Sequence, residues 1–207
     1  MQGYQIIEEM TARGISTNNT TSFSMPQYVA CMDAVSRGLE RAKANNVDLS
    51  RWRSVITHMS ARLTGLGDML DQAALRGIEI SPDEAQLAEL AVMKRAYRHI
   101  RDTGHPSKML MCSMRVNKDD GQGGARSLHI EKLAGGDFVY TCPPSYISAL
   151  MDVEDRLPAF DTNAINEELP ADLYDRLMRI PFFRQAYEPD GMEPVSYTHL
   201  RAHETVV

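Results

Sequence analysis

The sequence predicts an α/β fold in which parallel strands are joined by helical crossovers. Short segments with strand-like patterns alternate with longer segments of helical periodicity along the 207 residues. Such alternation is typical of parallel sheets, because a parallel connection needs a crossover. The hydrophobic content of 43% and charged content of 24% are those of an ordinary globular protein. A chain of this length can bury a sizeable core as one domain.

The composition argues against several classes of protein. A net charge of −6 does not suit a general binder of nucleic acid or membrane surfaces, which needs a basic face. No apolar run approaches the ~20 residues that span a bilayer, and the N-terminus lacks the basic flank and apolar core of a signal peptide. Three widely spaced cysteines indicate reduced thiols in the cytoplasm and not a disulfide framework or a zinc site. No cofactor and no metal are expected.

The chain begins with a predicted helix over residues 3–13, followed by a strand over 15–23. The strand is rich in β-branched and hydroxyl side chains, which favour extended backbone. Asn18 and Thr20 share one of its faces. Its centre is too polar for a plain core strand, so the alternative is a polar strand at the surface.

Two long helices are predicted from capping-box patterns, in which a serine is followed three residues later by Gln or Glu. Ser24 and Gln27 open the first, and Ser81 and Glu84 open the second. The second helix has apolar residues at helical spacing. Its expected buried stripe is Leu87, Leu90, Met93, Tyr97 and Ile100.

Between these helices, residues 54–58 are predicted to form a short strand, and residues 62–76 a helix. Thr57 lies within the end of this strand, and Arg62 follows just beyond it. His58 is assigned no role, because an isolated histidine near a strand end is more often structural than catalytic.

The next strand is centred on residues 109–111, which are apolar without interruption, as in a strand buried on both faces. Ser113 and Arg115 follow two residues apart and are expected to point to the same side of it. A hydroxyl and a guanidinium at the end of a buried strand make a plausible anion site, because the Arg fork fits phosphate bidentately. The alternative is an ordinary surface arginine just past a strand.

The rest of the chain continues the alternation. Residues 117–127 are polar and glycine-rich and are expected to form a mobile loop. The segment Pro181-Phe-Phe183 could not be placed from its sequence. The other predictions are a helix at 127–134, a strand at 138–142, a helix opened by Pro143-Pro144, an irregular acidic segment at 154–168 and a helix at 170–180.

The polar side chains at the strand ends predict one site. Functional groups of parallel sheets lie at the carboxyl ends of the strands. The residues expected at that edge are Thr20, Thr57, Arg62, Ser113 and Arg115. Two arginines and several hydroxyls at one edge of the sheet favour a phosphorylated polyol or sugar as the ligand.

The count of strands predicts a partial barrel. A full (β/α) barrel has eight strands in ~250 residues, whereas four are predicted here, and the chain starts inside a helix that no strand precedes. We therefore expect the later half of a TIM-type (β/α)8 barrel.

Four segments carry a resemblance to a known family. The first segment, residues 14–24, contains an Asn-x-Thr element before a Phe-Ser turn, and the second, residues 57–62, spans the end of the next strand. The third, residues 112–115, has the sequence Cys-Ser-Met-Arg. The fourth, residues 134–144, contains the last strand with its Asp and Pro. In order and spacing they resemble the transaldolases. The resemblance covers residues 1 to about 155 and implies an α/β barrel that moves a dihydroxyacetone unit between sugar phosphates through a lysine Schiff base.

The resemblance also implies roles for single residues. Arg62, Ser113 and Arg115 would bind the substrate phosphate, and Asn18 and Thr57 would hold substrate hydroxyls. The catalytic residue implied within this chain is Thr20, which would position the water used in proton transfer. Met59 falls where the family varies between transferase and aldolase behaviour.

The Schiff-base lysine is not expected within this chain, because in the family it lies on the strand before the first helix found here. Lys43 and Lys94 are expected to be solvated helix charges, and Lys118 lacks the burial that activates a lysine. The remaining lysines are Lys108 and Lys132. The chain alone is therefore predicted to be inactive. The intact parent would be a cytoplasmic enzyme of sugar phosphates and a possible homo-oligomer; the alternative is a non-catalytic sugar-phosphate-binding module.

The C-terminal residues differ from the rest. Residues 1–194 are assigned to the C-terminal portion of the barrel, whereas 195–207 resemble a translated sequencing adapter and show no periodicity that suits a core. His199 and His203 are spaced like a metal pair, but no third ligand is apparent, so no metal site is expected there.

Overall fold

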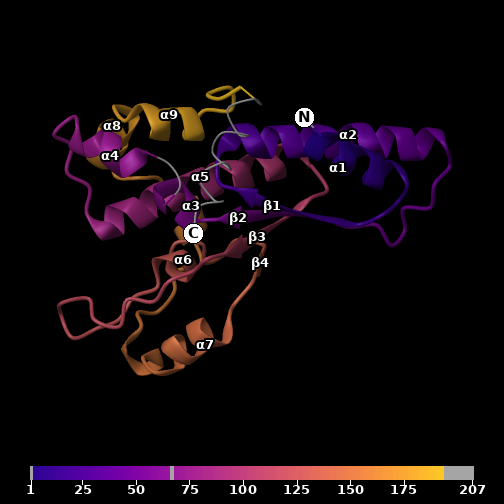
Figure 1. Ribbon diagram of the computed structural model, residues 1–207. Coiled ribbons are helices and arrows are strands. Elements are labelled where there is room, and N and C mark those ends of the chain that lie inside the picture. The colour runs from indigo at the N-terminus through magenta and orange to yellow at the C-terminus, as the bar shows by residue number, and fades with distance from the viewer. Residues whose placement is uncertain (1, 66–67, 194–207) are drawn as a thin grey trace.

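The computed structural model describes residues 2–65 and 68–193 and contains a four-stranded parallel sheet (Figure 1). The tail from 195 onward, with His199 and His203, lies outside the described residues. The strands lie in chain order across the sheet. They are β1 (Thr17–Ser22), β2 (Ser54–Met59), β3 (Lys108–Cys112) and β4 (Phe138–Tyr140).

The pairing of the strands confirms the predicted α/β class. All three neighbouring pairs are parallel, with Thr17 opposite Ser54, Thr57 opposite Leu110 and Leu110 opposite Val139. The register shifts between Asn19 and Ser22, so the end of β1 is irregular. Four parallel strands with flanking helices are consistent with a partial TIM-type barrel.

The helices agree with the predictions except in two segments. The helix predicted at 62–76 forms two short helices, and the segment that could not be placed forms a helix with Pro181 in its first turn. The helices are α1 (Gln2–Ala12), α2 (Met25–Ala44), α3 (Ala61–Gly65), α4 (Met69–Ala74), α5 (Pro82–Thr103), α6 (Leu128–Glu131), α7 (Pro144–Met151), α8 (Ala171–Met178) and α9 (Pro181–Tyr187), with 3-10 turns at Glu154–Arg156 and Ala164–Asn166.

Both capping boxes are present. Gln27 Oε1 accepts from the Ser24 backbone N–H at 3.2 Å, and Ser81 Oγ accepts from the Glu84 backbone N–H at 3.2 Å. These bonds satisfy N–H groups that have no partner within the helix. Helix α5 ends at Gly104, which has a φ of +63° and closes the helix in the left-handed conformation.

The helices pack around the sheet and form the core with it. Helices α1 and α2 lie side by side, while α4, α8 and α9 gather near the start of α5 (Figure 1). Gly38 lets α1 and α2 approach closely, because a Cβ there would lie 2.6 Å from the Glu8 carbonyl oxygen. Phe182 and Phe183 of α9 are buried in the core. None of the described helices combines the length and the apolar character that crossing a bilayer requires.

Candidate functional site

The first two strands carry three of the predicted site residues. Asn18 and Thr20 are exposed on β1, whereas Asn19 between them is buried. Thr57 on β2 is buried, and its Oγ1 donates to Asn18 Oδ1 at 2.6 Å. Asn18 and Thr57 therefore form one polar pair across neighbouring strands, near the exposed Thr20.

A serine at the end of β2 connects it to the end of β3. The Ser60 hydroxyl lies 3.3 Å from the Cys112 carbonyl and 3.2 Å from the Ser113 carbonyl. Arg62 lies in the first turn of α3 and is half-buried. Burial raises the pKa of the Cys112 thiol, while the Ser113 hydroxyl and the nearby charge of Arg62 act in the opposite direction. Arg62 thus lies within electrostatic reach of the end of β3.

Ser113 and Arg115 lie beyond β3, which ends at Cys112. The expectation that strand alternation directs both to one side of the strand is therefore wrong, because alternation applies only to extended backbone. Ser113 adopts a left-handed conformation with a φ of +62°, and Thr21 at the end of β1 does the same with a φ of +68°. Two non-glycine residues, one at the end of β1 and one just beyond β3, thus hold a sparsely populated backbone conformation.

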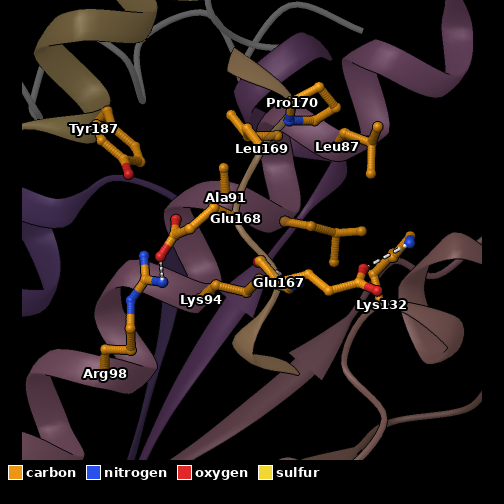
Figure 2. A pocket seen from close by; sticks show the side chains of 11 residues that line it. Leu87, Ala91, Lys94, Arg98, Lys132, Glu167, Glu168, Leu169, Pro170 and Tyr187 are labelled. Carbon is orange, nitrogen blue, oxygen red and sulfur yellow. Dashed lines mark hydrogen bonds and ion pairs between the residues drawn. The ribbon is translucent and has the colours of Figure 1, made fainter. Parts of the chain in front are cut away.

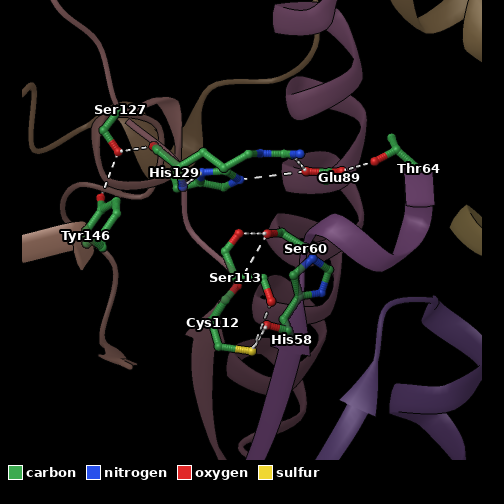
Figure 3. Close-up of polar contacts among 10 residues, drawn as sticks. His58, Ser60, Thr64, Glu89, Cys112, Ser113, Ser127, His129 and Tyr146 are labelled. Atoms are coloured by element: carbon green, nitrogen blue, oxygen red, sulfur yellow. Dashed lines mark hydrogen bonds and ion pairs between the residues drawn. The ribbon is translucent and has the colours of Figure 1, made fainter. Parts of the chain in front are cut away.

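The buried carboxylate of Glu89, which Figure 3 shows beside Thr64 and His129, holds the guanidinium of Arg115. Glu89 of α5 is fully buried, and its Oε2 lies 2.5 Å from Arg115 Nη2, whereas the Arg115 side chain remains 45% exposed. Thr64 at the end of α3 donates its hydroxyl to Glu89 Oε1. A buried carboxylate needs such partners, because unpaired burial of a charge is costly. One side of the guanidinium is therefore fixed, and nearly half of the side chain stays accessible.

The backbone of Arg115 is held from the opposite direction. Its N–H donates to Nδ1 of the buried His129 at 3.1 Å, and its carbonyl accepts from Ser127 Oγ at 2.9 Å. Ser127 in turn contacts the Tyr146 hydroxyl at 2.7 Å. Since His129 Nδ1 accepts, the neutral ring carries its proton on Nε2, which lies 3.7 Å from Glu89 Oε2 (Figure 3).

His58 is a buried structural histidine. Its Nδ1 contacts the hydroxyl of the buried Tyr28, and Cys112 Sγ donates to its carbonyl oxygen at 3.4 Å. Burial, with the nearby His129, lowers the pKa of His58 to about 3. The His58 ring is therefore buried, neutral and bonded to Tyr28.

The lysines lie away from this site, with one departure from expectation. Lys108 opens β3 and pairs with Asp137 at 2.6 Å, and Lys118 is exposed and pairs with Asp152 at 2.7 Å. Lys94 was expected to be solvated, but it is only 7% exposed, and burial lowers its pKa to about 8. That prediction was wrong because a helical lysine was assumed to face water.

Sequence reasoning missed Glu89, the residue that holds Arg115. A signal was present, because Glu89 lies on the same helical face as small buried residues at a spacing of three or four. These are Ala85 and Val92, with Ala96 seven positions beyond Glu89 on the same face. Thr64 and His129 carried no such signal, since each meets Glu89 only through the tertiary fold.

Metal and disulfide chemistry find no support in the part of the chain that the structure describes. It contains no group of three or more His, Cys, Asp or Glu side chains placed to hold a metal. None of the three cysteines forms a disulfide within the described residues, and Cys31 alone among them is buried.

Fold and site together define an α/β protein of parallel strands in which a half-exposed arginine, paired with a buried glutamate, follows the carboxyl end of β3. The sequence model of the family described as Transaldolase/Fructose-6-phosphate aldolase matches residues 1–186, so the chain belongs to that family.

Several curated relatives carry the name transaldolase. Transaldolase 2 of Nostoc punctiforme is 29% identical over 184 residues, which cover 78% of this chain and 48% of the relative. The transaldolase of Thiobacillus denitrificans is 28% identical over 187 residues, covering 80% of this chain and 48% of the relative. The transaldolase of Saccharopolyspora erythraea is 29% identical over 165 residues, which cover 75% of this chain and 44% of the relative. The chain spans about half the length of these relatives.

Proposed function

We propose that this chain supplies the phosphate-binding part of a transaldolase, which transfers a dihydroxyacetone unit between sugar phosphates through a lysine Schiff base. Arg62, Ser113 and Arg115 bind the substrate phosphate in this proposal. The observation that carries it is the Arg115 guanidinium, which the buried Glu89 fixes while the side chain stays 45% exposed. A preorganised guanidinium of this kind loses little freedom when a phosphate binds.

The polar pair on the first two strands binds the rest of the substrate. Asn18 and Thr57 hold sugar hydroxyls, and Thr20, exposed beside them, positions the water for proton transfer. Hydroxyls of a sugar match this pair because an amide and a threonine both donate and accept hydrogen bonds.

The Schiff-base lysine lies outside this chain in our proposal. Lys108 is the one lysine within a described strand, but it is at the amino end of β3, opposite the edge that carries Arg115. Residues 1–194 then form the C-terminal portion of a cytoplasmic (β/α)8 enzyme that assembles as a homo-oligomer, and the chain alone is inactive.

Phosphate binding tests the first part of the proposal. Titration calorimetry with fructose 6-phosphate is expected to show binding that Arg115→Ala weakens by roughly 1.5–3 kcal/mol, the strength of a charge-assisted hydrogen bond. Arg62→Ala should weaken it in the same direction. Arg51→Ala is the matched control, because Arg51 is exposed before the amino end of β2. Equal affinities of the Arg115→Ala and Arg51→Ala variants would contradict the assignment.

Chemical trapping tests the position of the lysine. Borohydride added with fructose 6-phosphate should leave the chain unlabelled in mass spectrometry, because Lys118 is paired with Asp152 at the surface and Lys108 lies at the amino end of β3. A stoichiometric adduct at one of the five lysines would show that this chain carries its own Schiff-base residue.

A further inference from the structure

A cavity of about 440 Å³ lies in the helical layer, apart from the strand-end site (Figure 2). Helix α5 forms one wall, and the segment 167–170 and Tyr187 of α9 close it. None of the residues around it belongs to the proposed phosphate site. Its size is within the range of small-molecule sites.

The wall of the cavity is apolar, with charges gathered on one side. Five lining residues are hydrocarbon: Leu87, Leu90, Ala91, Leu169 and Pro170. An apolar wall of this kind favours a ligand with a hydrocarbon or aromatic body, because contact removes apolar surface from water on both sides.

Ion pairs account for the two carboxylates at the cavity. Glu168 pairs with Arg98, and Glu167 Oε2 lies 2.8 Å from Lys132 Nζ (Figure 2). Lys94 supplies a third positive charge, so the charges that line the cavity sum to +1. Among the described residues, Lys94 forms no ion pair with a carboxylate.

The ammonium of Lys94 is bound only by neutral oxygens. Its Nζ donates to the Ala164 carbonyl at 2.6 Å and to the Glu167 carbonyl at 3.0 Å, and an ammonium has three protons. The residue is 7% exposed and lines the cavity. A buried cation held by carbonyls alone is incompletely compensated, since burial of a charge is costly unless it is paired.

We propose that this cavity is a second binding site, which takes a small carboxylate with an apolar body and pairs its single negative charge with Lys94. The hydrocarbon part lies against the wall formed by α5 and by Leu169 and Pro170. A sugar phosphate does not suit this cavity, because its hydroxyls would meet hydrocarbon and its phosphate carries more charge than Lys94 offers. The proposal is independent of the function proposed for the strand-end site.

Calorimetry with two matched probes tests the proposal on the whole chain. Phenylbutyrate should bind at least about tenfold more tightly than its uncharged amide, as expected for one charge-assisted contact. Lys94→Met should abolish this preference. Lys43→Met removes an exposed lysine charge from α2 and should leave the preference intact. Equal binding of acid and amide, or absence of binding of both, would overturn the proposal.

A second measurement needs no variant, in case Lys94→Met fails to fold. Burial lowers the pKa of Lys94 to about 8, so the free site loses its charge above that pH. The preference for the carboxylate should therefore decline between about pH 7 and about pH 9. The other charged or titratable groups at the cavity are Arg98, Lys132, Glu167, Glu168 and Tyr187, and binding of the amide reports any change in the cavity with pH that does not act through the charge of the ligand. A preference that does not change with pH would exclude Lys94 as its source.

Discussion

The pairing of Glu89 with Arg115 predicts an asymmetric double-mutant cycle. Removal of the Arg115 charge leaves a carboxylate with no exposure and with Thr64 as its remaining hydrogen-bond donor. Breaking a buried pair by loss of one partner costs about 3–5 kcal/mol, and the Thr64 bond places Arg115→Met near the lower value. Removal of the Glu89 charge leaves a guanidinium that is already 45% exposed and can turn to water. We therefore expect Glu89→Gln to cost only about 1–2 kcal/mol.

The double variant decides whether the two residues act as a pair. With Arg115 absent, the Glu89→Gln change removes an unpaired buried charge, so the double variant should be no less stable than Arg115→Met. The coupling energy would then have a magnitude of at least about 1–2 kcal/mol, the cost of Glu89→Gln alone. Urea unfolding followed through Trp52, the single and buried tryptophan, measures all four proteins. Additive costs, or a greater cost for Glu89→Gln than for Arg115→Met, would refute this reasoning.

Three further predictions concern other parts of the chain. His58 is neutral when folded with a pKa of about 3 but titrates near 6.5 when unfolded, so the unfolded state binds more protons between these values. Stability should therefore fall as pH decreases through that interval, by up to about 1.4 kcal/mol per pH unit, and His58→Gln should flatten the dependence seen in urea titrations. Gly38→Ala should destabilise the fold by about 1–3 kcal/mol, because the new Cβ would lie 2.6 Å from Thr11 Cβ. Gly3→Ala is the control, because Gly3 has open space around it and the change should not destabilise the fold. Equal melting temperatures of the two variants would contradict the close contact between α1 and α2. Thr57→Val should weaken fructose 6-phosphate binding by about 1 kcal/mol in calorimetry and leave the binding of inorganic phosphate unchanged. If the variant lost the binding of both ligands, the pair of Thr57 with Asn18 would support the whole site.

The sequence predicted the framework where local chemistry decides structure. Ser24 and Ser81 marked the first residues of the two longest helices, because capping boxes depend on residues four positions apart or fewer. The apolar run at 109–111 marked a strand that is buried on both faces. The family resemblance, carried by four short segments, agrees with the match of the family model to residues 1–186.

The contacts that position the site could not be predicted, because they join residues distant in the chain. Glu89 and Arg115 are separated by 26 positions, and Arg115 and His129 by 14. The same limit applies to Lys94, whose carbonyl partners follow it by 70 and 73 positions. A helical pattern shows which face of α5 is apolar, but not that a charged residue on that helix will find buried partners. The assigned roles of Asn18, Thr20, Thr57, Arg62, Ser113 and Arg115 stay predictions.

The positive φ angles of Thr21 and Ser113 have a consequence for engineering. A side chain in that conformation costs roughly 1–2 kcal/mol that glycine would avoid. Both positions thus carry a hydroxyl side chain in a backbone conformation that glycine would adopt without this cost. Glycine at either position should raise the free energy of unfolding. At Ser113, however, it would also remove a hydroxyl that we assign to the substrate phosphate. Stability and ligand affinity should therefore change in opposite directions at Ser113.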